Sequence, residues 1–237
     1  MQNHTVYQVS ILSALMQGIM GGVMPVRELL SHGDFGMGTF EGIGGELVIL
    51  DGKAYRCGAD GKVLPADPSD TVSFAQVTFF DAFSPLHMTE KVASFDQLKQ
   101  FLGQWTAEDP NIIYVVKGRT EDADVTVRSM DQQKPPYPTL EEAARSQKEY
   151  KGSHLSGTLI GFLFPPFMDG VNISSWHIHF LSDDRTRGGH LLELSSSSLH
   201  LQMYPIYNHT LRIPEGTSFA RLRHGKDQPD ALKKIEG

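Results

Sequence analysis

The feature that most constrains this chain is the run Trp176-His177-Ile178-His179-Phe180, with His190 eleven residues after His179. Side chains along a β-strand alternate between its two faces, so His177 and His179 share one face while the aromatic and aliphatic residues share the other. The polar segment between His179 and His190 ends in two glycines, which predicts a hairpin loop. The pattern therefore predicts a β-hairpin that carries three imidazoles on one face.

Three neighbouring imidazoles favour a catalytic transition-metal centre, because three protein ligands leave one position open for substrate or water. One alternative is that the three histidines are ordinary strand residues. Another is a cupin-type dioxygenase or isomerase, in which His-x-His is followed by a carboxylate ligand, and Asp183 lies at about that distance. That pattern also needs a glutamate that is missing here and a more distant third histidine. A non-enzymatic module that binds a metal or a small molecule is the remaining alternative.

The composition of the chain argues against nucleic acids and membranes as binding partners. The chain has 237 residues and a formal net charge of -7, without the run of Lys or Arg that attracts nucleic acids or anionic membranes. No window reaches about 20 uninterrupted apolar residues, and no basic region precedes the apolar N-terminal run. Cys57 is the only cysteine, which excludes an internal disulfide and suits a reducing cytoplasm. We therefore expect a cytoplasmic protein that acts on a small molecule, with no nucleic-acid or membrane partner.

Most of the chain has the pattern of strands, interrupted by a few helices. Asp51-Gly52 and Asp60-Gly61 predict the turns of two hairpins. Ser94 and Thr139 each begin a capping-box pattern, which predicts the start of a helix. The predicted strands cover residues 74–80, 112–116, 125–130, 157–163, 176–180, 199–204 and 211–213, and a further helix covers residues 11–19.

These elements predict an α+β, β-rich fold made of two closely packed halves. The proline-rich segment 134–138 lies near the expected boundary. We expect residues 1–150 to form an N-terminal mixed β-sheet with helices. We expect residues 151–237 to form a C-terminal antiparallel sheet that carries the histidine hairpin and a tail.

Four sequence blocks occur in order along nearly the whole chain: GDFGMGTFEGIGGELVILDGKAY, KPPYPTLEEA, GTLIGF and WHIHFLSDDRTRGGHLLEL. Together they resemble the bacterial alpha-acetolactate decarboxylases, and the histidine block matches in spacing as well as in residue type. The resemblance implies a zinc enzyme that converts 2-acetolactate to (R)-acetoin and carbon dioxide. It also implies a metal site between two packed β-rich halves and, usually, a homodimer.

Carried over residue by residue, the resemblance places the zinc ligands at His177, His179 and His190. It places a catalytic glutamate at Glu46, in the Gly-Glu-Leu block, and an arginine at Arg128, at the end of the central strand. The residues after Arg128 depart from the family pattern, which commonly continues with a Thr-Val-Pro type sequence.

Two further positions follow from the resemblance. Extension without gaps from Phe219-Ala220 places a second catalytic glutamate at Glu236. Thr39, at the start of a predicted strand, is expected either to contact the substrate or to pack against that strand.

The chemistry explains why such residues would be needed. Loss of carbon dioxide from a 2-hydroxy-3-keto acid leaves an enediolate, whose developing negative charge sets the barrier. Zinc held by neutral imidazoles stabilises that charge as a Lewis acid, so no organic cofactor is required. Arg128 suits the substrate carboxylate because its planar fork donates two hydrogen bonds. Glu46 supplies a proton-transfer group that delivers a proton to one face, although zinc nearby would favour a role as base or ligand.

Overall fold

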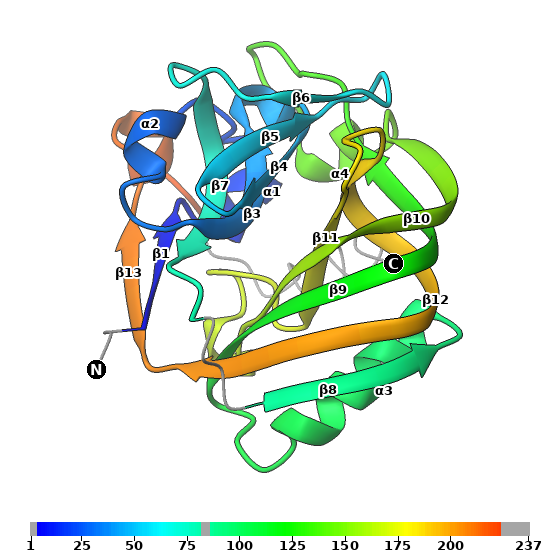
Figure 1. Cartoon of the computed structure of the whole chain (residues 1–237). Helices are drawn as coiled ribbons and strands as arrows, with labels where there is room; N and C mark the ends of the chain where they lie inside the picture. Colours follow the sequence, from blue (N-terminus) through cyan, green and yellow to red (C-terminus); the bar gives the residue numbers. More distant parts are fainter. Residues whose placement is uncertain (1–3, 82–85, 224–237) are drawn as a thin grey trace.

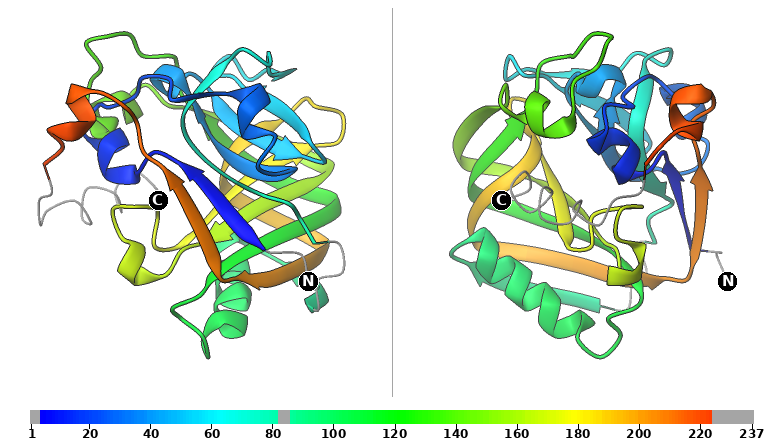
Figure 2. Two further views of the ribbon diagram at one scale, coloured as in Figure 1. Left: turned by 90° about the vertical axis from the view of Figure 1, so that its left-hand side faces the viewer. Right: turned by 180° about the vertical axis from the view of Figure 1, so that it is seen from behind.

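The computed structural model describes residues 4–81 and 86–223, which fold into two β-sheets packed against each other (Figure 1). Short helices cover the outside of the sheets, and one longer helix lies against the second sheet (Figure 2). No helix in the described part of the chain is long and apolar enough to cross a bilayer.

The first sheet is mixed. Its strands are β1 (Thr5–Val9), β2 (Met24–Pro25), β3 (Phe35–Phe40), β4 (Glu46–Leu50), β5 (Lys53–Cys57), β6 (Val63–Pro65), β7 (Thr71–Thr78) and β13 (Asn208–Arg212). The order is β13-β1-β7-β3-β4-β5-β6, and β2 pairs with β7. β1 and β13 run parallel although they lie far apart in the sequence. Asp51-Gly52 forms the turn between β4 and β5, with both residues at positive φ, as predicted for a tight hairpin.

The second sheet is antiparallel. Its strands are β8 (Leu86–Val92), β9 (Ile113–Ser129), β10 (Lys148–Leu163), β11 (Trp176–Ser182) and β12 (Gly188–Ile206). Their order is β11-β10-β9-β12-β8, and β11 pairs with β12 as well. Strands β9 to β12 therefore close into a ring, which gives the histidine hairpin a rigid support.

The inside of this ring is apolar. Ile178 and Phe180 of β11 pack there with Leu159 of β10, and Leu98 and Leu102 of α3 (Phe95–Thr106) join the same buried cluster. The apolar face of the histidine strand thus fills the ring, as the alternation predicted. The histidines consequently project from the outer face.

The first sheet packs against that outer face. Phe35 and Val48 of the first sheet share a buried cluster with Val115, Phe162 and Leu181 of the second. Burial of such side chains contributes roughly 1.5–3 kcal/mol each, so this contact holds the two sheets firmly together. Residues on the two facing surfaces can therefore form one site.

The remaining helices are short. They are α1 (Leu12–Met16), α2 (Val26–Leu29), α4 (Leu140–Ala144), α5 (Thr217–Ala220) and the 3-10 turns η1 (Glu41–Ile43) and η2 (Pro166–Met168). Thr139 and Glu142 form the predicted capping box at the start of α4. At α3 the hydroxyl of Ser94 accepts from the N–H of Gln97, but the Gln97 side chain accepts from Ala93.

The strand-rich α+β class was predicted correctly, but several boundaries were wrong. The strands predicted at 112–116 and 125–130 are the two ends of one continuous strand, β9, which begins at Ile113 and ends at Ser129. Its charged middle section alternates between solvent and the sheet interior, and pairing with β10 and β12 on both sides keeps it extended. Likewise β12 runs through four consecutive serines at 195–198, which a local pattern reads as a break. The helix predicted at 11–19 is shorter than expected, because α1 ends at Met16.

The chain passes between the two sheets more than once. β8 and β9 precede residue 150 but belong to the second sheet, whereas β13 follows it and belongs to the first. The sheets therefore exchange strands across the expected boundary. The division into residues 1–150 and 151–237 stays a prediction about domains.

Candidate metal centre and active site

Strand register in the second sheet places three side chains in one row. His179 of β11 pairs with His190 of β12, and His190 pairs with Arg128 of β9. Directly paired residues of antiparallel strands project from the same face, so two imidazoles and a guanidinium lie side by side. All three are buried, with exposed fractions of 0 % for His179, 5 % for His190 and 2 % for Arg128.

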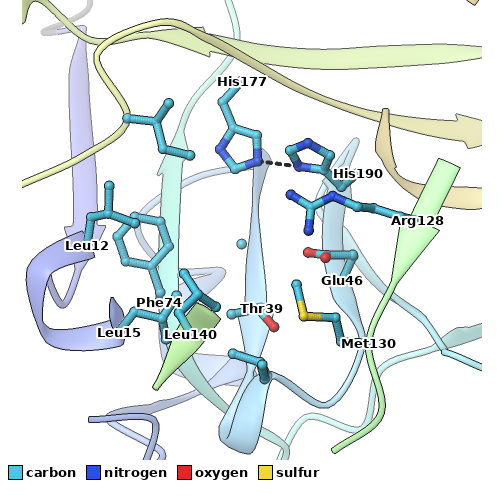
Figure 3. Close-up of a pocket in the computed structure, with 13 residues that line it drawn as sticks. Leu12, Leu15, Thr39, Glu46, Phe74, Arg128, Met130, Leu140, His177 and His190 are labelled. Atoms are coloured by element: carbon cyan, nitrogen blue, oxygen red, sulfur yellow. Dashed lines mark hydrogen bonds between the residues drawn. The ribbon is translucent and has the colours of Figure 1, made fainter. Parts of the chain in front are cut away.

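His177 joins this row from a position two residues earlier on β11. Its Nε2 lies 2.9 Å from Nδ1 of His190 and forms a hydrogen bond with it (Figure 3). One ligand nitrogen from each of His177, His179 and His190 lies within 4.8 Å of the other two. The hairpin thus brings the three imidazoles into one cluster.

The tautomer of His179 is fixed by a contact with the first sheet. Its Nδ1 donates to the backbone carbonyl of Leu47 at 3.0 Å, so its Nε2 carries the lone pair. That Nε2 is buried without a hydrogen bond from the described residues and lies 3.7 Å from Oε2 of Glu46. The lone pair of His179 Nε2 is therefore available to a metal ion.

The histidines are held in the neutral form. Burial lowers the pKa of His179 to about 3, the hydrogen bond to Leu47 opposes this shift, and the charge of Arg128 adds to it. Burial also lowers the pKa of His177 and of His190 well below the usual range, and Arg128 and the neighbouring imidazoles add to both shifts. The contact of His179 with Glu46 is therefore not an ion pair.

These observations fit a divalent transition metal. Neutral imidazole is the form that ligates metals, and three such ligands leave room for a substrate. The hydrogen bond from His179 to a backbone carbonyl is the kind of outer contact that orients a metal-binding histidine. The three-histidine group could hold zinc or another first-row metal.

The opposite wall of the site comes from β3 and β4. Thr39 and Glu46 are paired across these strands and face the histidine row (Figure 3). Both are largely buried, with exposed fractions of 8 % and 9 %. The hydroxyl of Thr39 donates to the carbonyl of Gly45 at 2.9 Å, which ties it to the residue immediately before Glu46.

A small pocket lies between the two walls and is lined by residues of both sheets. Its polar side is formed by Thr39, Glu46, Arg128, His177 and His190. Its other side is apolar and is formed by Leu12, Leu15, Ile43, Phe74, Met130, Leu140 and Ile173. Such a pocket suits a small ligand that has an anionic end and short alkyl groups.

Comparison with known proteins identifies a family whose members resemble this chain over nearly its whole length. A family model described as alpha-acetolactate decarboxylase matches residues 6–223. The alpha-acetolactate decarboxylase of Methanosarcina mazei is 36% identical over 232 residues, which cover 97% of this chain and 79% of the relative. That of Bacillus subtilis strain 168 is 30% identical over 233 residues, which cover 98% of this chain and 89% of the relative.

This chain belongs to the alpha-acetolactate decarboxylase family. It is accordingly an enzyme of the carbon–carbon lyase class. The family predicted from the four sequence blocks is confirmed.

Solved structures of the same family agree with the fold. The crystal structure of alpha-acetolactate decarboxylase from Bacillus subtilis strain 168 has a TM-score of 0.92 at 27% identity, covering 98% of this chain and 99% of that chain. A Staphylococcus aureus protein described as similar to alpha-acetolactate decarboxylase has a TM-score of 0.91 at 28% identity, covering 98% and 100%.

The structure of this decarboxylase-family chain gathers most of the predicted site residues. Thr39, Glu46 and Arg128 line the same pocket as His177 and His190, while their individual roles stay predictions. Glu236 lies outside the described residues. Asp183, the carboxylate of the cupin interpretation, lies in the hairpin turn, where Arg119 donates two hydrogen bonds to it at 2.7 and 2.6 Å.

Sequence reasoning missed the apolar wall of the pocket. Leu12 and Leu15 of α1 have the spacing of ordinary core residues, and Ile173 lies in the connection between η2 and β11. The wall is assembled from segments that are far apart in the chain, so no local pattern distinguishes it from the rest of the core. These residues can be recognised as pocket residues only from the tertiary structure.

Proposed function

We propose that this chain decarboxylates 2-acetolactate to (R)-acetoin and carbon dioxide, with a zinc ion held by His177, His179 and His190. The observation that carries this proposal is the row of neutral imidazoles and Arg128 that faces the buried carboxylate of Glu46. The family and the names of the relatives supply the substrate. The lining of the pocket, polar on one side and apolar on the other, suits the carboxylate and the methyl groups of this substrate.

Decarboxylation of a 2-hydroxy-3-keto acid places negative charge on the former keto oxygen and its neighbouring carbon. When bound, zinc supplies a Lewis-acid charge that stabilises this developing negative charge. The protein holds the imidazoles neutral, so they do not repel a cation. Burial and the hydrogen bond from His179 to Leu47 keep their orientation fixed.

Arg128 is the group that binds the substrate carboxylate. Its planar fork can donate two hydrogen bonds to a carboxylate, and burial strengthens them because water is excluded. The side chain of Gln147 accepts from Nη1 of Arg128 at 3.4 Å, which helps to hold the fork in place. The leaving group is thus held beside His190, at one end of the row.

Glu46 is the group that transfers the proton. Once carbon dioxide has left, the reacting carbon must take up a proton, and a carboxyl fixed on one wall delivers it to one face. Glu46 is nearly buried, which limits competition from bulk water. The apolar wall opposite receives the methyl groups of the substrate and fixes which face meets Glu46.

We also propose that Glu236 returns a second carboxylate to the site. This proposal rests on the family resemblance, because Glu236 lies outside the described residues. Deletion of residues 229–237 should lower turnover markedly, and Glu236→Gln should reproduce much of the loss while zinc stays bound. Wild-type turnover of the truncated chain would contradict this role.

The resemblance further supports a homodimer, and the single buried cysteine Cys57 is consistent with a cytoplasmic protein. Analytical ultracentrifugation tests the first point, with a mass of two chains as the expected result. A single chain at micromolar concentration would contradict it.

The function is tested with purified protein and racemic 2-acetolactate. Carbon dioxide release and chiral chromatography of the product should give one enantiomer, (R)-acetoin. A strong chelator should abolish the rate, and zinc should restore it. An undiminished rate in metal-free protein would exclude the zinc mechanism, whereas no acetoin from the zinc-loaded protein would exclude the substrate.

A further inference from the structure

The loop that joins β3 to β4 has an unfavourable backbone conformation and ends at the proposed proton-transfer group. Gly42, Ile43 and Gly45 all have positive φ, at 65°, 49° and 95°. Glycine adopts this region freely, but a β-branched residue such as Ile43 does so rarely. Ile43 nevertheless lines the pocket, and Glu46 follows directly after the loop. Contacts with the rest of the protein must hold this conformation in place.

Several contacts hold the start of the loop. The carboxylate of Glu41 accepts hydrogen bonds from the hydroxyls of Thr71, at 2.7 Å, and Tyr137, at 3.3 Å. The N–H of Gly42 donates to the carbonyl of Met20 at 2.8 Å, and its own carbonyl accepts from the N–H of Gln133 at 2.7 Å. These contacts fix Glu41 and Gly42.

The end of the loop is held by Arg56, whose side chain lies on the face of the sheet opposite the pocket. Arg56 on β5 pairs with Leu47, whose side chain belongs to the buried cluster on that far face. The guanidinium lies 3.6 Å from the centroid of the Phe40 ring and 3.0 Å from a carboxylate oxygen of Asp70. It also donates to the carbonyl of Gly44. One side chain thus connects both ends of the loop to the sheet.

We propose that Arg56 is a positioning residue that holds Glu46 at its working distance from the histidine row, through the loop and from the far side of the sheet. This inference rests on the proposed role of Glu46 in proton transfer. Arg56 is not among the residues that line the pocket. Arg56 acts through the backbone, since it fixes the carbonyl of Gly44, two residues before Glu46. The next carbonyl, that of Gly45, accepts a hydrogen bond from the hydroxyl of Thr39.

Loss of this contact should displace the acid without displacing the metal ligands. Without the hydrogen bond that Arg56 donates to the carbonyl of Gly44, the loop can relax toward negative φ at Ile43, and Glu46 moves with it. A displacement of about 1 Å can lower a rate by about 10²-fold even when the change lies far from the chemistry. The histidines belong to the other sheet and keep their geometry.

The test compares four variants of the full-length, zinc-loaded protein. Arg56→Met should lower kcat by about 10- to 100-fold with a much smaller change in KM and with zinc content unchanged. Arg56→Lys keeps a donor and the charge beside Asp70, so it should recover part of the rate. Asp70→Asn leaves the donor to Gly44 in place and should have a smaller effect than Arg56→Met. Arg27→Met, at an exposed arginine of α2, is the control and should match the wild type.

A double-mutant cycle separates positioning from general damage. If Arg56 acts through Glu46, Arg56→Met should lower the rate in the wild-type background but scarcely at all in the Glu46→Gln background. Equal losses in both backgrounds would overturn the inference while leaving the proposed function intact. A wild-type protein that makes no acetoin would instead contradict the proposed function.

A crystal structure of the Arg56 variants tests the inference independently of activity. In Arg56→Met, Ile43 should leave its positive φ and the distance from Glu46 Oε2 to His179 Nε2 should change. Arg56→Lys should retain more of the original loop and serves where Arg56→Met does not fold. An unchanged loop in both variants would show that Arg56 does not position Glu46.

Discussion

The site has two walls that are built in different ways. The histidine wall, on the second sheet, carries His177, His179, His190 and Arg128, and the acid wall, on the first sheet, carries Thr39 and Glu46. On the second sheet, Arg128, His190 and His179 are neighbours because three adjacent strands are paired in one register. On the first sheet, Glu46 follows a loop with three residues at positive φ, held by contacts from several distant segments. The positions of the histidines therefore depend on regular strand pairing, whereas the position of the Glu46 carboxyl depends on tertiary contacts of the loop before it. The proposed metal binding and proton transfer should accordingly be separable by mutation.

A hydrogen bond nevertheless joins the two walls at His179. Nδ1 of His179 donates to the carbonyl of Leu47, the residue after Glu46. This contact sets the distance between the two sheets at the site and fixes the tautomer of the histidine at the same time.

The largest expected effect is on the histidine wall. His179→Ala removes a proposed metal ligand and the contact with the first sheet, so the rate should fall by about 10³-fold or more, the upper end for loss of one electrostatic stabiliser. Zinc content, measured by atomic emission, should fall with it. Circular dichroism should stay native because Ile178 and Phe180 still fill the ring. Wild-type zinc content with a wild-type rate would remove His179 from the ligand set.

A somewhat smaller loss is expected from the acid wall. Glu46→Gln keeps the shape of the side chain but not the transferable proton, so kcat should fall by about 10²- to 10³-fold, within the range for acid–base groups. Zinc should remain bound, in contrast to His179→Ala. Glu193→Gln, an exposed glutamate of β12, is the matched control. If Glu46→Gln lost zinc as well, the two walls would not be separable, and Glu46 would act as a ligand.

Arg128→Lys tests whether the end of the row binds the carboxylate. Lysine keeps the charge but loses the planar fork, so kcat/KM should fall by about 10- to 100-fold with zinc retained. Isothermal titration with a carboxylate substrate analogue should show weaker binding. An unchanged rate would transfer carboxylate binding to another group.

The smallest effect concerns stability of the metal-free protein. The pKa of His179 is lowered to about 3 in the folded protein, while the unfolded chain keeps a value near 6.5. Below about pH 6.5 the unfolded state binds a proton that the folded state does not, so stability is lost as the pH falls from there. The contribution reaches about 1.4 kcal/mol per pH unit.

Urea unfolding of the metal-free protein between pH 7 and pH 5 measures this slope. Metal-free His179→Asn should show a shallower dependence, because the substituted side chain does not titrate. Identical slopes in the two proteins would mean that His179 is not held neutral by burial.

Sequence alone predicted the histidine wall because its information is local. The alternation of β11 determines which residues share a face, and the polar segment before His190 indicates the hairpin, although Gly188 and Gly189 belong to β12 and not to its turn. The acid wall was different, since Glu46 precedes four apolar residues and has the pattern of an ordinary strand residue. Family resemblance identified it, and the loop that places it depends on residues as distant as Gln133. The continuity of β9 was missed for a similar reason, because its polar middle is extended only between two partner strands.

The central claim is that the histidine row of the second sheet is the metal site and that the acid wall is not. Anomalous diffraction on both sides of the zinc absorption edge, from crystals of the wild type and of Glu46→Gln, tests this most directly. The account predicts one zinc peak in each protein, within bonding distance of His177, His179 and His190. A peak elsewhere, or a peak that disappears in Glu46→Gln, would contradict it.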